Sequence, residues 1–568
     1  MKQKNKRYIL GINSVYHESS ACLVKDGKLI AAVEEERFNR KKHAKSATID
    51  NVRLLPFNAI NFCLKKAGIT MKDVDIVGYS FDPEKRYIKN SEVDEYFNNG
   101  DWGSKEGERK FYELNKKIAN ILGKYYDVDL NGKFIFVPHH VGHLASAFFV
   151  TPYKNAAILC VDGIGEFEST SLAVGKENKI EIVSQIDYPH SLGFLWEKFS
   201  KYLGFSEYDA CKVMGLSSYG DHKVFLKRFE KFIKIKEDGD FVIDNGILKF
   251  RLEDYAKIEE ILGPKRSKDD PIEKRHEDIA ATLQFITEEI VIRLCNRLSK
   301  MTKSKNLCLA GGVALNCVVN GKIIEKTPFE NVWVQPGAND AGTSIGVAFQ
   351  IWNELLDNPR SYVMEHAYLG PEFSNNEIKQ ILEGYKLNYY KPKSVEEETA
   401  KLIAEGNIIA WFQGAMEFGP RALGNRSILV DPRTEKMRDI LNYRVKHREP
   451  FRPFCPSVLK NKANQYFGGK NSEARKYMLA AVNVLSNEIP AVTHIDNTAR
   501  IQEVEKRTNL RYYNLLKEFE KITGVPVLLN TSFNDQEPIV CTPEDAVKTF
   551  LKTNIDHLAI GDFIVSKR

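Results

Sequence analysis

Apolar residues near the N-terminus fall into three short runs separated by polar positions. The runs are YILGI (8–12), SSACLV (19–24) and KLIAAV (28–33), and Asp26-Gly27 separates the last two. An Asp-Gly pair between two apolar runs is typical of a tight β-hairpin. The pattern therefore predicts three consecutive strands at the start of the chain.

The same pattern recurs from residue 156. AAILCV (156–161) is followed by TSLAVGK (170–176) and IEIVSQI (180–186), again with a loop after the first run and a tight turn after the second. Two copies of one strand triplet predict a duplicated α/β domain. Actin-like folds use such triplets, with the first loop facing a phosphate.

A long helix and a break in the pattern mark the end of the first domain. Residues 277–300 carry apolar residues at helical spacing and predict a long packed helix. The stretch DNPRSYV (357–363) then interrupts the periodicity. We therefore expect a first domain at residues 1–365 and a second α/β domain at residues 366–568.

The second domain alternates apolar runs of strand length with helical segments, as an α/β domain does. The segment TPEDAVKTFLKT (542–553) has a capping pattern at its start and predicts a helix. The expected strands are NIIAWFQG (407–414), YMLAAVNV (477–484), VPVLLNTS (525–532) and HLAIGDFIV (557–565).

Composition narrows the function. The net charge of +6, from 82 basic and 76 acidic residues among 568, is too small to indicate a nucleic-acid partner. No apolar stretch approaches the ~20 residues of a membrane helix, so no membrane partner is expected, and the N-terminus lacks a signal-peptide pattern. Nine cysteines without a C-x-x-C pair predict reduced thiols in a cytoplasmic protein.

The motif PHHVGH (138–143) follows the apolar run FIFV and concentrates three of the 12 histidines of the chain. Pro138 suits the first position of a helix. His139 and His143 are then four residues apart on one helical face, as chelating histidines must be. His140 and His143 also have a spacing that allows convergence, and a helix that merely contains histidines is the alternative.

Two carboxylates and two glycine loops lie where strands are expected to end. Asp162 opens the loop DGIGE (162–166), and Asp340 follows the run VWVQP. The loop AGGVALN (310–316) follows another apolar strand. Backbone N–H groups exposed by glycine can cradle phosphates. The alternative is that each Asp-Gly or Gly-Gly pair is only a tight turn.

Basic residues gather in the second domain, in GPRALGNRS (419–427) and NYRVKHREPFRPF (442–454). A solvated surface is the alternative interpretation. However, these residues alternate with Gly, Pro and Phe, and Arg452 lies inside Phe-Arg-Pro-Phe. Arginine among apolar groups needs an anion, and its fork fits phosphate or carboxylate oxygens. Arg500 and the polar loop NTSFN (530–534) are candidates to complete such a pocket.

Taken together, these motifs resemble the NodU/CmcH family of carbamoyltransferases over nearly the whole chain. The motifs that carry the resemblance are HESSACLVKDG (17–27), EEERFNRKKH (34–43), PHHVGH (138–143), VDGIGE (161–166), KVMGLSSYG (212–220), GGVALN (311–316), QPGANDAG (335–342), EFGPRALGNRS (417–427), REPFRPF (448–454), TARIQ (498–502) and NTSFN (530–534).

The resemblance implies an actin-like (ASKHA) first domain, similar to the tRNA threonylcarbamoyl transferases, and a YrdC-like second domain. The second domain would hydrolyse carbamoyl phosphate and join the carbamate to AMP from ATP. The first would hold a divalent metal, Fe²⁺ in this family, and transfer the carbamoyl group to a hydroxyl of a small-molecule natural product. The sequence leaves the acceptor and the oligomeric state open.

The resemblance also implies roles for particular residues of this chain. His17 would lie near the acceptor site, and His140 would be a neighbour of the metal rather than a ligand. The metal ligands would be His139, His143, Asp162 and Asp340. The activation pocket would use Arg421, Lys446, Arg448, Arg452, Arg500 and Asn530. The expected nucleotide-binding residues are Gly163, Gly165, Lys212, Gly311, Gly312 and Asn316.

The sequence departs from the family pattern at Cys211, Ser217-Ser218 and Gln536, where Gly, Ala-Pro and Gly are more usual. None of these positions is an expected ligand, so they bear on loops or on the acceptor. Two other functions are alternatives for this sequence: a tRNA-modifying enzyme of the threonylcarbamoyl type, and a non-catalytic actin-like ATPase. The second basic cluster has no task in the ATPase, and the net charge indicates no tRNA surface.

Overall fold

The computed structural model describes residues 7–89 and 100–567, and the chain forms two compact units. The first unit comprises Met1–Glu36 and His43–Met364, and the second comprises Arg37–Lys42 and Glu365–Arg568. The short excursion of residues 37–42 falls within the region that the sequence pattern assigned to the first domain. The excursion includes most of helix α1 (Glu36–Asn39).

Hydrogen bonds to backbone carbonyls explain why residues 37–42 pack with the second unit. The buried Arg37 donates to Gly419 O at 2.9 Å, and Arg40 donates to Pro538 O and Ile539 O, each at 2.7 Å. Hydrophobic periodicity does not reveal such contacts, because polar side chains make them.

Within the described residues, the first unit contains two five-stranded sheets of one design. In each sheet the first three strands form an antiparallel meander, and two later strands pair in parallel beside the first strand of the meander. The strands of one sheet, in spatial order, are β3 (Lys28–Glu34), β2 (Ser20–Lys25), β1 (Tyr8–Asn13), β4 (Ile76–Tyr79) and β5 (Phe134–Phe136). Those of the other are β8 (Lys179–Asp187), β7 (Glu168–Lys176), β6 (Asn155–Val161), β11 (Asn306–Ala310) and β12 (Asn331–Val334). The predicted duplication of strand triplets is therefore present.

The turn between β2 and β3 has the predicted form. Asp26 and Gly27 have φ angles of 49° and 76°, and positive φ at both central residues matches the right-handed twist of the flanking strands. A Cβ on Gly27 would lie 2.4 Å from the indole nitrogen of Trp352. This glycine is therefore required by both the turn and its packing.

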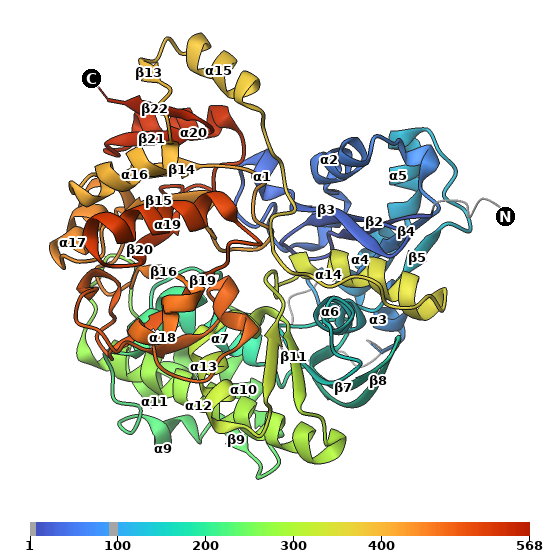
Figure 1. Ribbon diagram of the computed structural model, residues 1–568. Coiled ribbons are helices and arrows are strands. Elements are labelled where there is room, and N and C mark those ends of the chain that lie inside the picture. The colour runs from blue at the N-terminus through green and yellow to red at the C-terminus, as the bar shows by residue number, and fades with distance from the viewer. Residues whose placement is uncertain (1–6, 90–99, 568) are drawn as a thin grey trace. The chain divides into compact units, whose positions relative to one another are not determined.

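Helices α6 (His139–Phe148) and α14 (Ala341–Phe349) pack directly against each other in the first unit (Figure 1). A Cβ on Gly346 would lie 1.7 Å from Gly142 O, so the close approach of the two backbones requires glycine at position 346. The other helices are α2 (Phe57–Ala67), α3 (Pro83–Lys89), α4 (Lys105–Lys116), α5 (Ile118–Tyr126), α7 (Leu192–Tyr202), α8 (Ala210–Ser217), α9 (Leu226–Phe229), α10 (Asn245–Leu248), α11 (Ala256–Leu262), α12 (Lys274–Thr302) and α13 (Cys317–Lys326).

The part of the second unit that the structure describes is built on one mixed eight-stranded sheet. Its strands, in spatial order, are β13 (Tyr389–Tyr390), β22 (Phe563–Ser566), β21 (His557–Ile560), β14 (Ile409–Phe412), β15 (Arg426–Val430), β20 (Val527–Ser532), β16 (Cys455–Leu459) and β19 (Gln502–Val504). Its α-helices are α15 (Asn375–Gly384), α16 (Val395–Ala404), α17 (Lys436–Leu441), α18 (Ala463–Tyr466), α19 (Leu510–Thr523) and α20 (Pro543–Lys552).

Apolar side chains cover both faces of this sheet. Along β14, Ile409 and Trp411 pack in a core with α16 and α19, whereas Ala410 and Phe412 pack in the opposite core with α20. This alternation follows from the period of two along a strand. A mixed α/β architecture is therefore confirmed for both units.

Two details of the predicted strands were wrong. The run HLAIGDFIV is two antiparallel strands, β21 and β22, because Gly561 turns the chain at a φ of 56°. The run YMLAAVNV contains only the short β17 (Ala481–Asn483), which pairs with β18 (Thr498–Arg500) outside the large sheet. The predicted helix α20 begins with the expected cap, since Thr542 accepts from Asp545 N at 3.1 Å. No helix in the described ranges is long and apolar enough to cross a membrane.

Candidate metal and anion sites

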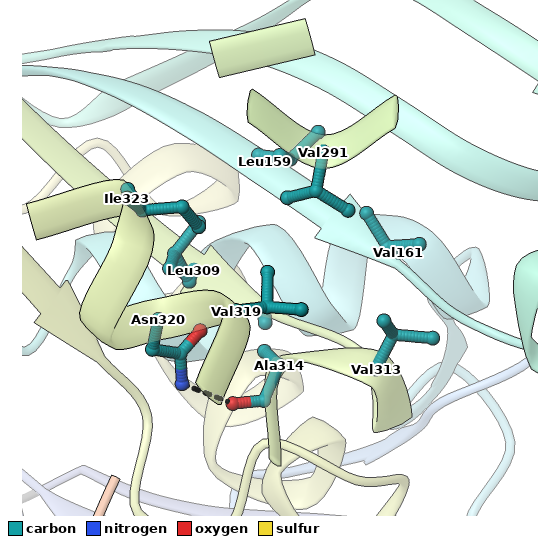
Figure 2. A pocket seen from close by; sticks show the side chains of 10 residues that line it. Leu159, Val161, Val291, Leu309, Val313, Ala314, Val319, Asn320 and Ile323 are labelled. Atoms are coloured by element: carbon teal, nitrogen blue, oxygen red, sulfur yellow. Dashed lines mark hydrogen bonds between the residues drawn. The ribbon is translucent and has the colours of Figure 1, made fainter. Parts of the chain in front are cut away.

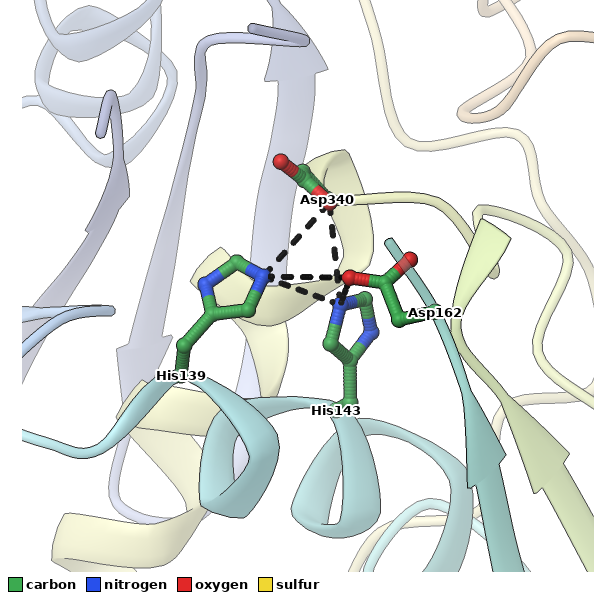
Figure 3. Close-up of side chains that lie close together, drawn as sticks. All are labelled: His139, His143, Asp162 and Asp340. Carbon is green, nitrogen blue, oxygen red and sulfur yellow. Dashed lines mark hydrogen bonds and ion pairs between the residues drawn. The ribbon is translucent and has the colours of Figure 1, made fainter. Parts of the chain in front are cut away.

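Four buried side chains converge in the first unit (Figure 3). His139 and His143 extend from one face of α6, Asp162 follows β6, and Asp340 precedes α14. The two Nε2 atoms are 3.2 Å apart. Asp162 Oδ2 lies 3.7 Å from His139 Nε2 and 3.5 Å from His143 Nε2, and Asp340 Oδ1 lies 3.5 and 3.7 Å from the same two atoms.

These distances are short enough for one metal ion to contact all four side chains. The printed separations are 3.2–3.7 Å, and all four ligand atoms lie within 4.8 Å of one another. Bonds of about 2.0–2.2 Å from imidazole nitrogen and carboxylate oxygen to a zinc-like metal span such separations. Imidazole and carboxylate together suit divalent first-row metals such as iron and zinc. The donor set therefore fits the divalent metal that the sequence motifs led us to expect.

Electrostatics in this cluster favour a cation. Burial by itself opposes ionisation, but the imidazoles of His143 and His139 hold the pKa of Asp162 well below its usual range. The pKa of Asp340 is also held well below its usual range, first by His17 and then by His139, although burial opposes this. In turn, Asp340 and Asp162 raise the pKa of His139, and Asp162 raises that of His143, although burial opposes both. A divalent cation would take the place of the imidazole protons, because a metal binds neutral imidazole and ionised carboxylate.

Neighbouring groups orient these side chains. His139 Nδ1 lies 3.0 Å from Ser80 O, which directs Nε2 toward the cluster. Glu166 accepts the backbone N–H of His139 at 2.9 Å and that of Asp82 at 2.8 Å, holding the start of α6. Burial raises the pKa of this carboxyl. Glu166 lies in the VDGIGE motif, but no local pattern distinguishes it from the other polar residues there.

The third histidine of the motif, His140, turns away from the cluster. Its Nδ1 lies 2.8 Å from Ser171 Oγ, and burial lowers its pKa to about 3. A Cβ on Gly165 would lie 2.8 Å from the imidazole of His140, so this glycine makes room for the ring. Of these two histidines, His139 therefore converges with His143, and its role as a metal ligand remains a prediction.

His17 lies beside the cluster, where its role in acceptor binding remains a prediction. Its Nδ1 is 3.7 Å from Asp340 Oδ2, and 29% of its side chain is exposed. Asn13 Nδ2 donates to the carbonyls of both His17 and Glu18, at 3.1 and 3.0 Å. The loop that carries His17 is therefore fixed to the end of β1.

The glycine loops pack against His139, His143, Asp162 and Asp340, which are called the metal-type cluster below. Gly312 N donates to Asp162 Oδ1 at 2.8 Å, and a Cβ on Gly311 would lie 2.3 Å from Val161 O. Gly163 lies against Gly193, whose added Cβ would be 2.5 Å from its backbone. These contacts show what the glycines do for packing, and their binding of a nucleotide remains a prediction.

The two polar residues predicted to bind nucleotide have internal partners. Asn316 caps α13 by accepting from Val319 N at 3.1 Å, and its amide donates to Gln284 Oε1 at 2.8 Å. Lys212 pairs with Asp209 at 3.2 Å on α8. The binding of a nucleotide by Asn316 and Lys212 remains a prediction.

Behind the loop 311–316 lies a small apolar pocket (Figure 2). Leu159 and Val161 of β6, Leu309 of β11 and Val291 of α12 line it. Among its lining residues only Asn320 has a polar side chain, and its amide donates to Ala314 O at 2.7 Å. A pocket without charged groups does not provide a phosphate site.

In the second unit, basic side chains gather where β15 and β16 begin and β20 ends. β20 runs antiparallel to both neighbours, with Ser532 opposite Ser427 and Asn530 opposite Cys455. These strand ends therefore meet at one edge of the sheet. Lys446 reaches this edge, since its Nζ donates to Ser532 O at 2.9 Å.

Lys446 is a buried cation held by neutral acceptors. Besides Ser532, it donates to Asn534 O at 2.7 Å and to Asn534 Oδ1 at 2.8 Å. Burial, and then the guanidinium groups of Arg448 and Arg452, hold the pKa of Lys446 well below its usual value. The carboxylate of Asp535 acts in the opposite direction and raises the pKa of Lys446. The guanidinium groups beside Lys446 are suited to bind an anion.

Arg448, Arg452 and Arg500 each have partners within the second unit, and Arg448 donates to Asn442 Oδ1 at 3.2 Å. Arg448 lies over the ring of Phe454 at 4.1 Å, and Arg452 makes a 3.5 Å ion pair with Glu449. Arg500 lies 3.0 Å from the thiol of Cys455. All three are partly exposed.

Arg421 and Asn530 are tied to the same edge of the sheet. Asn530 donates to Ser457 Oγ at 3.0 Å and to Ala422 O at 3.3 Å, next to Arg421. Glu417 Oε1 accepts the N–H groups of Leu423 and Asn425 at 2.7 and 2.8 Å and shapes the loop that carries Arg421. A carboxylate enclosed by this loop was visible in the EFGPRALG motif, but its role was not.

Two other basic residues of the same sequence segments have structural roles. Arg426 is fully buried and donates to Gln413 O at 2.6 Å and Pro371 O at 3.0 Å, with its guanidinium 3.7 Å from the centre of the Phe412 ring. Arg444 pairs with Asp556 at 2.6 Å. The basic segments therefore contain both anchors and candidate anion ligands.

The first unit thus contains a buried cluster of metal-type ligands, and the second contains partly exposed arginines around the buried Lys446. Metal-type ligands and anion-binding cations are both groups that enzymes use. Comparisons with known proteins name the class of enzyme. Residues 8–349 match the family described as Carbamoyltransferase N-terminus, and residues 400–567 match Carbamoyltransferase C-terminus.

Relatives cover almost the whole chain. It is 40% identical to an uncharacterized protein of Synechocystis sp., over 99% of this chain and 97% of that protein. It is 36% identical to nodulation protein NolNO of Sinorhizobium fredii, over 98% of this chain and 80% of that protein. Among solved structures, full-length HypF in its phosphate- and nucleotide-bound form covers 63% of this chain and 57% of its own at 15% identity and a TM-score of 0.34, too distant to carry an argument.

The chain belongs to the carbamoyltransferase family, and the resemblance seen in its motifs is confirmed. It is an enzyme that transfers carbamoyl groups. The donor of the carbamoyl group, the metal and the acceptor are matters of proposal.

Proposed function

We propose that the protein is an ATP-dependent O-carbamoyltransferase in which each unit carries one half of the reaction. In the second unit, carbamoyl phosphate is hydrolysed to carbamate and phosphate, and carbamate attacks the α-phosphorus of ATP. Carbamoyl adenylate forms and pyrophosphate leaves. In the first unit, the hydroxyl of a small-molecule acceptor attacks the carbamoyl carbon, the carbonyl–oxygen bond to AMP breaks, and AMP leaves.

The observation that carries the proposal is the different ligand chemistry of the two centres, imidazole and carboxylate in one and ammonium and guanidinium in the other. The basic cluster around the buried Lys446 suits an anionic substrate, because charge-assisted bonds from Arg448 and Arg452 would stabilise phosphate charge during adenylation. The carboxylates of Asp162 and Asp340 attract a cation instead. Activation and transfer ask for these two different environments.

His139, His143, Asp162 and Asp340 would hold the divalent metal, which we propose to be Fe²⁺. When bound there, a divalent metal supplies a Lewis acid that polarises the carbamoyl group or acidifies the acceptor hydroxyl. Around it, Ser80 and Glu166 keep the ligands oriented. His17, beside Asp340, would contact the acceptor.

We also propose an actin-like fold for the first unit and a YrdC-like fold for the second. The strand order of the two sheets in the first unit, a meander followed by two parallel strands, supports an actin-like domain. The mixed sheet of the second unit, with basic residues at one edge, supports a YrdC-like activation domain. Gly163, Gly165, Lys212, Gly311, Gly312 and Asn316 are proposed to contact the nucleotide.

The test is mass spectrometry of the protein incubated with carbamoyl phosphate, ATP and a panel of hydroxylated small molecules. We expect one acceptor to gain a carbamoyl group, with AMP and pyrophosphate released in equal amounts. Pyrophosphate release should require carbamoyl phosphate. Carbamoyl transfer that proceeds equally well without ATP would refute the activation step.

A further inference from the structure

A carboxylate–imidazole pair lies beside the metal-type cluster in the first unit. Glu18 Oε1 is 2.6 Å from His43 Nδ1. The side chains are partly accessible, with 14% of Glu18 and 27% of His43 exposed. Burial by itself raises the pKa of Glu18, but the imidazole of His43 outweighs burial and lowers it. The carboxylate is therefore ionised and accepts the Nδ1 proton.

The backbone holds this pair in an unusual conformation. Glu18 and His43 have φ angles of 52° and 62°, and Ala44 follows at 65°. Residues other than glycine adopt such angles rarely and at a cost. Glu18 N donates to His43 O at 2.9 Å, and His43 N donates to Glu36 Oε2 at 2.8 Å. Two segments 25 residues apart in the chain are thus locked together at this point.

Hydrogen bonds connect the pair to the metal-type cluster. Asn13 donates to Glu18 O at 3.0 Å and accepts from Ser80 Oγ at 2.8 Å. The carbonyl of Ser80 in turn holds His139 Nδ1 at 3.0 Å. The dyad and the proposed metal ligand therefore share one supporting residue, Ser80, and their relative position is fixed.

Aromatic contacts place His43 close to His17. The ring of Tyr208 stacks on His43 at 4.3 Å between centroids, and His17 meets the same ring edge-on at 5.4 Å. The centroids of the two imidazoles are 6.5 Å apart. A small molecule bound at His17 would therefore be within reach of His43.

The Nδ1 atoms of His17 and His43 have different surroundings. His17 Nδ1 is buried without a hydrogen-bond partner among the described residues and faces Asp340. His43 Nδ1 is bound by Glu18, which fixes the tautomer that leaves Nε2 as the basic nitrogen and stabilises the imidazolium. This is the arrangement of a general base.

We propose that His43, oriented by Glu18, is the general base that accepts the proton of the acceptor hydroxyl. The inference rests on the proposed function, in which the acceptor is a hydroxyl. The oxygen forms a bond to the carbamoyl carbon, the bond from that carbon to the AMP oxygen breaks, and the hydroxyl proton passes to His43 Nε2. The ionised Glu18 balances the imidazolium until the proton is released to solvent.

Other titratable groups face this pair, so its pH dependence is shared. Glu36 binds the backbone of His43, and Tyr208 and His17 flank its ring. Glu197 on α7 lies near His17 and Tyr208, and burial raises its pKa to about 7. A pH profile alone would therefore not assign the base, and the test compares variants and nucleophiles.

The experiment uses the full chain with carbamoyl phosphate, ATP and one of two probes. Ethanol needs a base to become a nucleophile, whereas hydroxylamine attacks without one. His43→Asn should lower the formation of ethyl carbamate by about 10²-fold or more and leave hydroxyurea formation nearly unchanged. Glu18→Gln should lower ethyl carbamate formation less. His222→Asn, at a histidine stacked on Phe285 far along the chain, is the matched control and should change neither.

An equal loss of both products in His43→Asn, or no loss of either, would overturn the assignment. A wild-type protein that forms no hydroxyurea would count against the proposed function instead. Nitrogen-15 NMR of the histidine side chains tests the dyad independently of any acceptor. It should show His43 protonated at Nδ1, with a lower imidazole pKa in Glu18→Gln. Protonation of neutral His43 at Nε2 would exclude it as the base.

Discussion

The two charged centres of this protein differ in how they are stabilised without a ligand. In the first unit, His139, His143, Asp162 and Asp340 face a common point, and each has an oppositely charged or polar neighbour within 3.7 Å. In the second unit, the charged groups around Lys446 include two guanidinium groups and the carboxylate of Asp535, and its ammonium group donates to oxygens of Ser532 and Asn534.

This difference follows from charge. Carboxylates and imidazoles attract one another, so a metal-type cluster can be assembled in the fold before the metal binds. Cations of one sign repel, so a basic cluster must keep its members apart on carbonyl, amide and aromatic partners until an anion arrives. The first centre should therefore depend on the exact set of ligands and the second on the geometry of each cation.

Removal of one ligand of the first centre tests whether the two centres act separately. His139→Ala should lose the bound metal, and carbamoyl transfer to an acceptor should fall by about 10³-fold or more, because Lewis-acid stabilisation is worth several kcal/mol. Carbamoyl-phosphate-dependent release of pyrophosphate should persist, since the second unit performs that step. Metal analysis and both assays on one preparation provide the measurement.

His140→Asn is the matched control for that variant, because His140 lies on the same helix but turns to Ser171. It should retain its metal. Full metal content in His139→Ala would show that the ligand set is wrong, and loss of pyrophosphate release would show that the two centres are not separable.

In the second centre, replacement of an arginine by lysine keeps the charge but removes the guanidinium shape, and activity should fall. Arg448→Lys or Arg452→Lys should reduce carbamoyl-phosphate-dependent pyrophosphate release by about 10²-fold, because lysine loses the guanidinium fork that binds a developing anion. Folding and metal content should be unchanged. The loss should appear with or without an acceptor, since activation comes first.

Arg444→Lys is the matched control, because Arg444 belongs to the same basic segment but pairs with Asp556. Its rate should stay within about twofold of wild type, as expected for a partly exposed ion pair. Wild-type rates in both Arg448→Lys and Arg452→Lys would return the cluster to a solvated surface.

Sequence reasoning predicted the first centre more completely than the second. The spacing of His139 and His143 on one helix is a local property, and strand ends locate Asp162 and Asp340. The choice between His139 and His140 needed the structure, because it depends on how α6 rotates against α14. The two helices meet where a Cβ on Gly346 would lie 1.7 Å from Gly142 O, and this tertiary contact leaves no local pattern in the sequence.

The basic segments were harder to interpret from sequence, because arginine serves as an anchor and as a ligand with the same local signature. Arg426 looked like Arg421 in the sequence, yet it is fully buried on backbone carbonyls. The pairing of Glu18 with His43 was also hidden, although both lie in motifs that were visible. Long-range polar contacts of this kind leave no periodic pattern.

The excursion of residues 37–42 provides a third, smaller test, on stability. Arg37→Ala should lower the free energy of unfolding of the second unit by about 1–3 kcal/mol, because Gly419 O loses its buried donor. Gly419 begins the loop that carries Arg421, so pyrophosphate release should fall as well. Chemical denaturation followed by domain-specific fluorescence or hydrogen exchange would measure the change.

For the same reason, residues 366–568 expressed alone should be less stable than a version to which residues 37–42 are joined. Lys41→Ala, at an exposed residue of the same segment, is the control and should have little effect. Equal stability of the two fragments would show that the excursion is not needed by the second unit.

The smallest expected effect concerns the pH dependence of anion binding by Lys446. Burial and the neighbouring guanidinium groups lower its pKa in the free protein, so it loses its proton at a lower pH than an ordinary lysine, whose pKa is about 10.4. A neutral Lys446 attracts an anion less, so the affinity for inorganic phosphate should fall as pH rises through this lowered pKa. Loss of the charge from one hydrogen bond is worth about 1 kcal/mol, which is about fivefold in affinity.

Lys446→Arg keeps its charge and should bind phosphate with a flatter pH dependence, whereas Lys446→Met should bind at the weak high-pH level throughout. Calorimetric titrations at several pH values would measure all three proteins. If wild type and Lys446→Arg showed the same dependence, the titrating group would be the phosphate itself, and Lys446 would be a structural cation like Arg426 rather than part of the anion site.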